Sequence, residues 1–143
     1  MRISEVVAGK ASQDIVTITP EATVRELVAL LAQHNIGAAV VSSDGASVSG
    51  IVSERDVVRL LNGNDQALSA TVADIMTTNV RTCEPGSSLD EVRRFMTEGR
   101  FRHLPVVEDG RLVGVVSIGD VVKSHIAEVE FERDQLDSYV HQT

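Results

Sequence analysis

The sequence contains two copies of one pattern, and this repeat limits the possible folds more than any other feature. Residues 50–58, GIVSERDVV, return as residues 114–122, GVVSIGDVV. Residues 20–27, PEATVREL, correspond to residues 85–92, PGSSLDEV, 65 positions later. Each copy must form the same unit, and a unit of about 65 residues would be only marginally stable alone, because small chains bury a smaller fraction of their surface. We therefore expect the two halves to pack together and to fold as one module.

The composition limits the classes of protein to which the chain can belong. Its 143 residues are 43% hydrophobic and 3% aromatic, so the core must consist mainly of valine, isoleucine, leucine and alanine. The net charge of −8 argues against binding to nucleic acid or to an anionic membrane surface, because both require a basic face. No apolar run approaches the ~20 residues of a membrane span, and there is no signal-peptide pattern.

A single cysteine, Cys83, excludes an internal disulfide, so we expect an intracellular, cytoplasmic protein. We expect Cys83 to be a small buried hydrophobic residue rather than a reactive thiol. His34, His125 and His141 show no metal-ligand spacing, and no metal site is predicted.

The two halves predict the same order of elements, β-α-β-β-α. Each first helix begins with a capping-box pattern, Thr23 with Glu26 and Ser88 with Glu91. The turns Asp44-Gly45 and Asp109-Gly110 separate the second and third strands of each half. The predicted strands are 15–18, 38–42, 48–53, 80–83, 104–107 and 112–117. The predicted helices begin after Thr23 and Ser88, at Glu54 (ending at Leu61) and at Ile118, and their buried faces include Val24, Leu27, Val28, Leu31, Leu89, Val92, Phe95 and Met96.

The predicted elements divide the chain into four segments. Residues 1–62 form the first repeat with a leading helix, 63–71 a connector, 72–123 the second repeat, and 124–143 a C-terminal helical extension. In the extension, hydrophobic residues follow heptad spacing, with Arg133 interrupting: Val122, Ile126, Val129, Leu136 and Val140. Counted from Asp120 to His141, this helix would be about 33 Å long. That is longer than its own half of the chain needs. We expect it to pack on a partner chain; the alternative is that it folds back over its own domain or frays.

Ser53 and Asp56, and their counterparts Ser117 and Asp120, are the candidate functional residues. Each serine ends a strand and begins a helix, where free N–H groups and the helix dipole attract phosphate. The carboxylate three residues later could accept both hydroxyls of a ribose. For one copy alone, ordinary helix capping is the better explanation. Two copies at matched points of a repeat shift the balance toward ligand binding.

Basic residues near these positions indicate a local anion site. Arg102 and His103 are neighbours at the start of a strand, so they cannot both face a dry core. Arg55 lies within the first Ser-x-x-Asp motif. The alternative is that these residues form surface ion pairs with acids such as Glu54 or Glu98.

With these features, the sequence resembles a tandem pair of cystathionine-β-synthase (CBS) domains over residues 3–123. The resemblance rests on residues 74–77 (DIMT), residues 103–106 (HLPV), Asp109-Gly110 and the two Gly-h-h-Ser-x-x-Asp motifs, where h is hydrophobic. It implies an α+β, sandwich-like fold in which two β-α-β-β-α units pair with pseudo-two-fold symmetry and leave two clefts between them.

The resemblance also implies which residues line the clefts. In nucleotide-binding members, the first two strands of one repeat contact adenine, and the aspartate of the other repeat's motif meets the ribose. One cleft would be lined by Thr17, Ile18, Ile36, Gly37 and Ala38, with Ser117 and Asp120. The other would be lined by Val80, Thr82, Phe101, Arg102 and His103, with Ser53, Arg55 and Asp56.

The two expected clefts differ in charge. In AMP-sensing kinase subunits of the family, basic residues matching Arg102 and His103 contact phosphate, whereas the first repeat has Gly37 and Ala38 there. Gly119 likewise stands where the other motif has Arg55. The less basic cleft needs Lys10, Lys123 or a partner chain to neutralise phosphate, binds a different ligand, or stays empty.

The sequence thus predicts a non-catalytic regulatory module. AMP is the favoured ligand, with ADP, ATP or NAD(H) as alternatives, and binding would signal to an unidentified regulated protein through a conformational change in a homodimer. The alternative is a ligand-independent interaction or dimerisation module. Catalysis is not expected, because the sequence has no Walker loop, no metal-ligand set and no nucleophile paired with a base.

Overall fold

The computed structural model describes residues 1–10 and 14–141, which form two compact units. Unit 1 contains residues 1–10, 83–106 and 114–141, and unit 2 contains residues 14–82 and 107–113. The last two residues of the predicted extension, 142–143, lie outside the described part. The mixture of small sheets and helices confirms the predicted α+β class.

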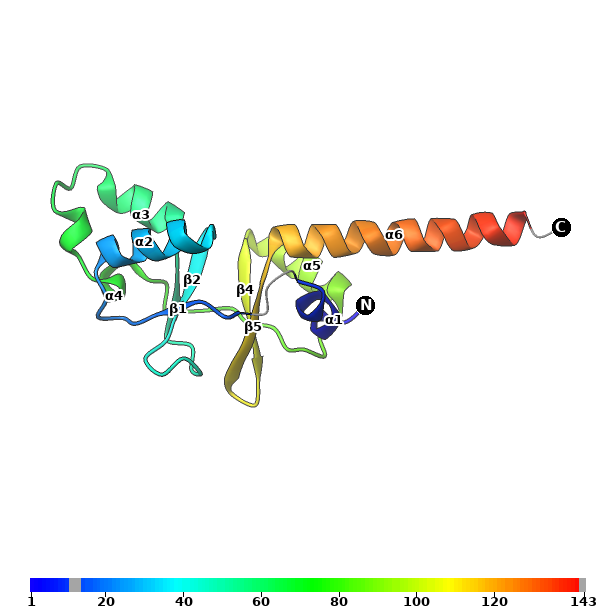
Figure 1. The fold of residues 1–143 in the computed structure, drawn as a ribbon, viewed down its shortest axis with the longest axis horizontal. Coiled ribbons are helices and arrows are strands. Elements are labelled where there is room, and N and C mark those ends of the chain that lie inside the picture. Colours follow the sequence, from blue (N-terminus) through cyan, green and yellow to red (C-terminus); the bar gives the residue numbers. More distant parts are fainter. Residues whose placement is uncertain (11–13, 142–143) are drawn as a thin grey trace. The chain divides into compact units, whose positions relative to one another are not determined.

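Unit 2 is a small three-stranded sheet packed with helices (Figure 1). The strand order is β1-β2-β3, with β1 parallel to β2 and β2 antiparallel to β3, so that Ala38 pairs with Ser53. Its elements are β1 (Thr17–Ile18), α2 (Val24–His34), β2 (Ala38–Val41), β3 (Gly50–Ser53), α3 (Glu54–Leu61), the 3-10 helix η1 (Ala67–Ser69) and α4 (Val72–Ile75). All four residues of β2 are buried, because this central strand is covered on both faces.

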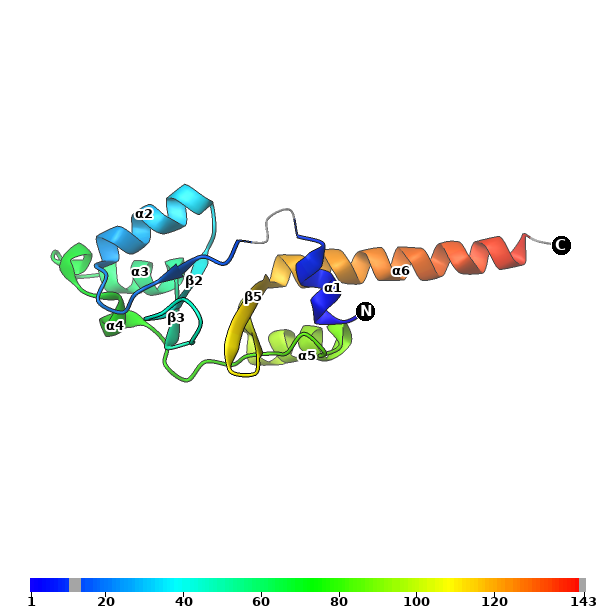
Figure 2. The same cartoon turned by 60° about the horizontal axis from the view of Figure 1, so that its bottom comes forward.

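Unit 1 repeats the arrangement around the β4-β5 hairpin (Figure 2). Its elements are α1 (Ile3–Ala8), α5 (Leu89–Gly99), α6 (Ile118–Val140) and most of β4 (His103–Glu108) and β5 (Arg111–Ser117). The turn end of this hairpin, residues 107–113, belongs to unit 2. Leu89, Met96 and Leu104 are among its fully buried side chains. Cys83 is also buried, as predicted, and burial raises its pKa to about 11, so the thiol is inert at neutral pH.

The matched helices α2 and α5 begin and end in the same way. The hydroxyl of Thr23 accepts a hydrogen bond from the N–H of Glu26, and that of Ser88 accepts one from Glu91, both at 3.1 Å. Both helices end at a left-handed residue, Asn35 (φ 52°) or Arg100 (φ 58°). Asparagine tolerates this conformation better than arginine does, so Arg100 is the more strained of the two C-caps.

The short helix α1 packs against the second repeat rather than the first. The N–H of Ile3 donates to the carbonyl of Ser87 at 2.9 Å, and that of Ser4 donates to Pro85 at 2.9 Å. Ile3 has no exposed surface and lies in the core of unit 1. Burying such a side chain contributes about 1.5–3 kcal/mol.

The helix α4 makes the reciprocal contact with the first repeat. Val72 N–H donates to the carbonyl of Ala22 at 2.8 Å, and Ala73 N–H donates to Pro20 at 2.9 Å. Val72 is fully buried in the core of unit 2. The leading helices are therefore exchanged, so each compact unit combines segments from both sequence repeats, whereas the sequence-based division groups each leading helix with the repeat that follows it.

Three local predictions were wrong. Residues 80–83 form no strand, because within this stretch only Cys83 forms a bridge, to Val106. Val28 and Phe95 were expected on buried faces but are 41% and 38% exposed, because each lies at the edge of an apolar stripe narrower than predicted. The other predicted helices and strands are present with shifted ends.

Helix α6 extends unbroken over 23 residues, as the sequence predicts. It carries too many charged side chains to cross a bilayer, and no helix in the described ranges is long and apolar enough to do so.

Gly50 provides a test of this packing. Replacing it with alanine should lower the free energy of unfolding by about 1–3 kcal/mol, because the added Cβ would lie 2.8 Å from both Met76 Sδ and the Thr77 carbonyl oxygen. Urea denaturation measures the change. The matched control is Gly86→Ala, since Gly86 is exposed and an added Cβ there meets no atom within 4 Å. Equal stability of both variants would contradict close packing of β3 against the segment after α4.

Candidate functional site

Ser53 and Asp56 form a reciprocal cap at the start of α3. The Asp56 Oδ2 atom accepts a hydrogen bond from the Ser53 N–H at 2.8 Å, and the Ser53 Oγ atom accepts one from the Asp56 N–H at 3.4 Å. The Ser53 hydroxyl also lies 3.2 Å from Asp56 Oδ2. The Asp56 Oδ1 atom accepts no hydrogen bond from the part of the chain that the structure describes. The carboxylate thus caps the helix through one oxygen and keeps the other available to a ligand.

Ser117 and Asp120 repeat this geometry at the start of α6. Asp120 Oδ2 accepts from the Ser117 N–H at 2.9 Å, and Ser117 Oγ accepts from the Asp120 N–H at 3.1 Å. These capping hydrogen bonds are by themselves a sufficient reason for serine and aspartate to occur in both motifs. The structural role that capping predicts is therefore present in both copies, whether or not a ligand binds.

Lys10 distinguishes the second motif from the first. Its Nζ atom lies 3.1 Å from Asp120 Oδ2 and donates to the Val115 carbonyl at 2.8 Å. Burial raises the pKa of Asp120, but the Ser117 N–H and the Lys10 ammonium together outweigh this and bring the pKa below its usual range. One candidate aspartate therefore already has a cation beside it.

The basic residues lie just before the hairpin of unit 1. Arg102 is exposed and His103 is partly buried, so neither enters the core. The Arg102 carbonyl accepts a hydrogen bond from the Ile118 N–H at 2.8 Å, which joins this segment to the start of α6. The ring of Phe101 packs beside Phe95 with centroids 5.3 Å apart. The same backbone contact recurs in unit 2, where Gly37 accepts from Glu54 at 2.9 Å.

The predicted cleft residues fall into two groups, one in each unit. Unit 1 brings together the residues of the hairpin and of the α6 cap: Phe101, Arg102, His103, Ser117 and Asp120. Unit 2 contains the others: Thr17, Ile18, Ile36, Gly37, Ala38, Ser53, Arg55, Asp56, Val80 and Thr82. The pairing of the two groups across two clefts stays a prediction.

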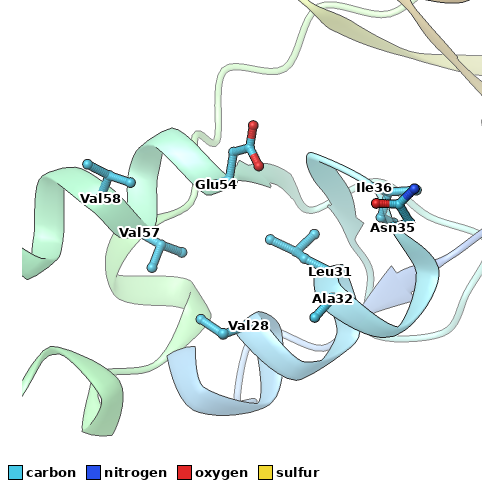
Figure 3. Close-up of a pocket in the computed structure, with 8 residues that line it drawn as sticks. All are labelled: Val28, Leu31, Ala32, Asn35, Ile36, Glu54, Val57 and Val58. Carbon is cyan, nitrogen blue, oxygen red and sulfur yellow. The ribbon is translucent and has the colours of Figure 1, made fainter.

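Unit 2 also contains an apolar cavity of about 350 Å³ between α2 and α3 (Figure 3). Val28, Leu31 and Val57 extend into it from the two helices, while Asn35 and Glu54 supply polar atoms at one end. Val58, at its rim, is 65% exposed. In the described ranges, no cluster of three or more histidine, cysteine or acidic side chains could hold a metal ion.

These repeated features match a known family. Residues 3–63 and 72–126 each match the CBS domain. The chain belongs to the CBS domain family. The two matched segments correspond to the two sequence repeats, so the protein is a tandem CBS domain pair.

Relatives of the CBS pair occur among both sequences and solved structures. A mitochondrial CBS domain-containing protein of Arabidopsis thaliana is 36% identical over 127 residues, which are 85% of this chain and 62% of that protein. A crystal structure of a CBS-domain containing protein from Agrobacterium tumefaciens is 40% identical, with a TM-score of 0.82 over 87% of this chain and 99% of that one.

A third relative was solved with bound ligands. It is a CBS domain pair in complex with 5′-methylthioadenosine and S-adenosyl-L-methionine, 25% identical, with a TM-score of 0.77 over 87% of this chain and 99% of that one. Both ligands of that protein contain adenosine.

Lys10 is the site residue whose role sequence reasoning defined least well. The sequence offers Lys10 only as one of several possible cations that could neutralise phosphate in the less basic cleft. The available signal was that Lys10 and Lys123 are the chain's only lysines.

Replacing Lys10 with methionine should raise the pKa of Asp120, because the neighbouring ammonium is lost. Carbon-13 NMR titration of the carboxyl group measures this shift. Since the folded-state pKa lies below the ordinary 3.8, ionised Asp120 stabilises the fold above that pH and loses this effect as the pH falls through the folded-state value. In Lys10→Met, the folded-state pKa should lie closer to 3.8, so this stabilisation should be smaller and its loss should be complete at a higher pH. Lys123→Met, which removes an exposed ammonium from α6, should leave the titration unchanged.

Proposed function

We propose that this CBS pair is a non-catalytic regulatory module that binds an adenosine-containing nucleotide, with AMP favoured over ADP, ATP and NAD(H). The observation that carries the proposal is the pair of matched Ser-Asp caps. Each presents a carboxylate at a helix N-terminus, and at Asp56 one oxygen is unused by the cap. Adjacent ribose hydroxyls can donate to a carboxylate, while the helix N-terminus favours nearby phosphate.

Relatives support the adenosine part of this proposal. The CBS pair solved with 5′-methylthioadenosine and S-adenosyl-L-methionine shares the fold and most of the length of this chain. Neither ligand carries a phosphate, so the basic residues of this chain supply the argument for a nucleotide. Arg55, Arg102 and His103 would face the phosphate of AMP in one cleft.

The second cleft would use Lys10 in a different way. Its ammonium is already 3.1 Å from Asp120, and phosphate would compete with that carboxylate for it. An uncharged ligand end, such as the adenosine of a thioether, would leave the ion pair intact. The two clefts therefore differ in the ligand that we expect them to prefer.

Ligand binding can be separated from folding with three aspartate variants. Asp56→Ala and Asp120→Ala should abolish binding at their respective sites. Asp74→Ala is the matched control, because Asp74 accepts from the Thr71 N–H at 3.1 Å in a similar cap outside the predicted clefts. All three should lose on the order of 1 kcal/mol of stability, but only the first two should lose ligand.

Thermal shift with AMP, ADP, ATP, NAD, NADH and S-adenosylmethionine provides the measurement. A ligand at 100 times its dissociation constant adds about 2.7 kcal/mol, which raises the melting midpoint by several degrees. Binding that persists in both Asp56→Ala and Asp120→Ala would remove these residues from the site. A cooperative melt that no ligand shifts would refute nucleotide binding.

A ligand-independent interaction module is the second candidate function. The cavity between α2 and α3 and the exposed valines at its rim favour it, because exposed apolar surface of this kind is typical of protein interfaces. In either case we infer that the chain acts as a homodimer and reports to a regulated protein.

Truncation after Lys123 should weaken the dimer, because it removes the exposed apolar residues of the helical extension. Sedimentation velocity over a range of concentrations measures the change. If the truncated chain dimerises as strongly as the full chain, the extension does not contribute to the dimer.

A further inference from the structure

The C-terminal part of α6 has no cover from the rest of the chain. Every residue from Val129 to Val140 is exposed, over about 18 Å of helix. Figure 1 shows α6 continuing as a single straight helix beyond α1 and α5 of the same unit. A helical segment of only about 12 residues is marginally stable in water through its own hydrogen bonds, and most helices in proteins are stabilised by packing of an apolar face.

One face of this helix carries an apolar stripe, the seam. Its members are spaced alternately by four and three residues and are 44–65% exposed where hydrophobic: Val122, Ile126, Val129, Arg133, Leu136 and Val140. At 3.6 residues per turn, all six lie within about 80° of one another. Val121 and Glu128, which face the helix's own unit, lie about a quarter turn or more from the centre of the seam. The seam is thus free to meet another helix along its length.

We propose that the seam pairs in antiparallel orientation with the seam of a second copy of this chain, in a register centred on Phe131. This proposal rests on the homodimer of the proposed function and specifies one of its contacts. In this register, Val122 lies level with the partner's Val140, and Ile126 lies level with the partner's Leu136. Val129 lies level with the partner's Arg133.

The spacing alone allows a parallel pair, but the charges disfavour it. In a parallel coil, Arg133 would face the partner's Arg133 in one buried layer. Glu132 would also lie opposite the partner's Asp137, which repels it. Both contacts place like charges together.

The antiparallel pair relieves both contacts. Near its two-fold axis Glu130 and Glu132 each approach their own counterpart in the partner, but the two Arg133 guanidinium groups lie beside these glutamates. The two arginines occupy separate layers, each beside a valine, and the stem of Arg133 can cover Val129 while its guanidinium reaches water. That guanidinium is nearly level with the partner's Glu130. Lys123 likewise lies opposite the partner's Asp137. In the single chain, the Arg133 guanidinium makes an exposed ion pair with Asp134 at 3.5 Å. Losing an exposed ion pair on dimerisation has little effect on the free energy.

Engineered cysteines distinguish the orientations in the full-length protein. Ile126→Cys and Leu136→Cys are made as single variants and treated with a short bismaleimide, alone and mixed. In the antiparallel pair, two copies of residue 126 are about 15 Å apart along the axis, whereas residue 126 faces the partner's residue 136. We expect cross-linked dimer from the mixture and little from either variant alone. Wild type is the control, since its one thiol, Cys83, is buried.

Each other result overturns the proposal. Cross-linking of each single variant with itself would establish a parallel pair. Absence of cross-linking from every combination, with sedimentation still showing a dimer, would refute seam pairing while leaving the proposed dimer intact. A monomer by sedimentation would refute both, and ligand binding by thermal shift is independent of all three results.

Charge substitutions provide a second test. Leu136→Glu should weaken dimerisation about tenfold or more, because it places a charge opposite the partner's Ile126. Phe131→Glu is the matched control: Phe131 is 64% exposed but lies on the side of α6 opposite the seam. Arg133→Leu should strengthen association and allow single variants to cross-link, because it removes the charge that disfavours the parallel pair. Equal weakening by both glutamate variants would contradict the seam.

Discussion

Both hydrophobic cores depend on the backbone contact between each leading helix and the turn before the other repeat's first long helix. Helices of four and six residues are not stable alone, so α1 and α4 are held by the Ile3–Ser87 and Val72–Ala22 hydrogen bonds and by burial of Ile3 and Val72. Without its exchanged helix, each core would expose apolar surface. The glycine that opens each Gly-h-h-Ser-x-x-Asp motif belongs to the same arrangement. The absence of a side chain at Gly50 leaves room for the Met76 side chain, and Gly114 leaves room for Val7 at the equivalent place.

The repeated motif combines folding and function in the same atoms. Capping explains the presence of serine and aspartate in both copies, and this role is visible in the hydrogen bonds. A carboxylate that caps a helix is also held in one rotamer, which lowers the entropic cost of presenting it to a ligand. The two motifs therefore differ in their cations. Lys10 lies beside Asp120 of the second motif, whereas Arg55 lies within the first motif.

Helices and strands with strong local signals could be predicted from the sequence. Contacts between residues that are distant in the chain could not. Capping pairs placed the starts of α2, α3 and α5, and the heptad spacing placed α6, because these depend on residues within one or two turns. The exchange of α1 and α4 was not foreseen, since a short apolar segment packs equally well on either repeat. Residues 80–83 were assigned to a strand by analogy with β1, although only Cys83 has a strand partner. For the site, the sequence identified both caps, but it does not show that Lys10 lies beside Asp120, because the two residues are far apart in the chain.

The exchange also determines the order in which the chain can fold during synthesis. The three-stranded sheet of unit 2 and its helix α4 are complete in the emerging chain once Ile75 has appeared. Helix α1, although made first, must wait for α5, the hairpin and Val121. At 5–20 residues per second, that wait lasts about 6–24 s. During this time the apolar side chains of Ile3 and Val6 lack their core, so this segment stays accessible to chaperones and proteases until unit 1 closes.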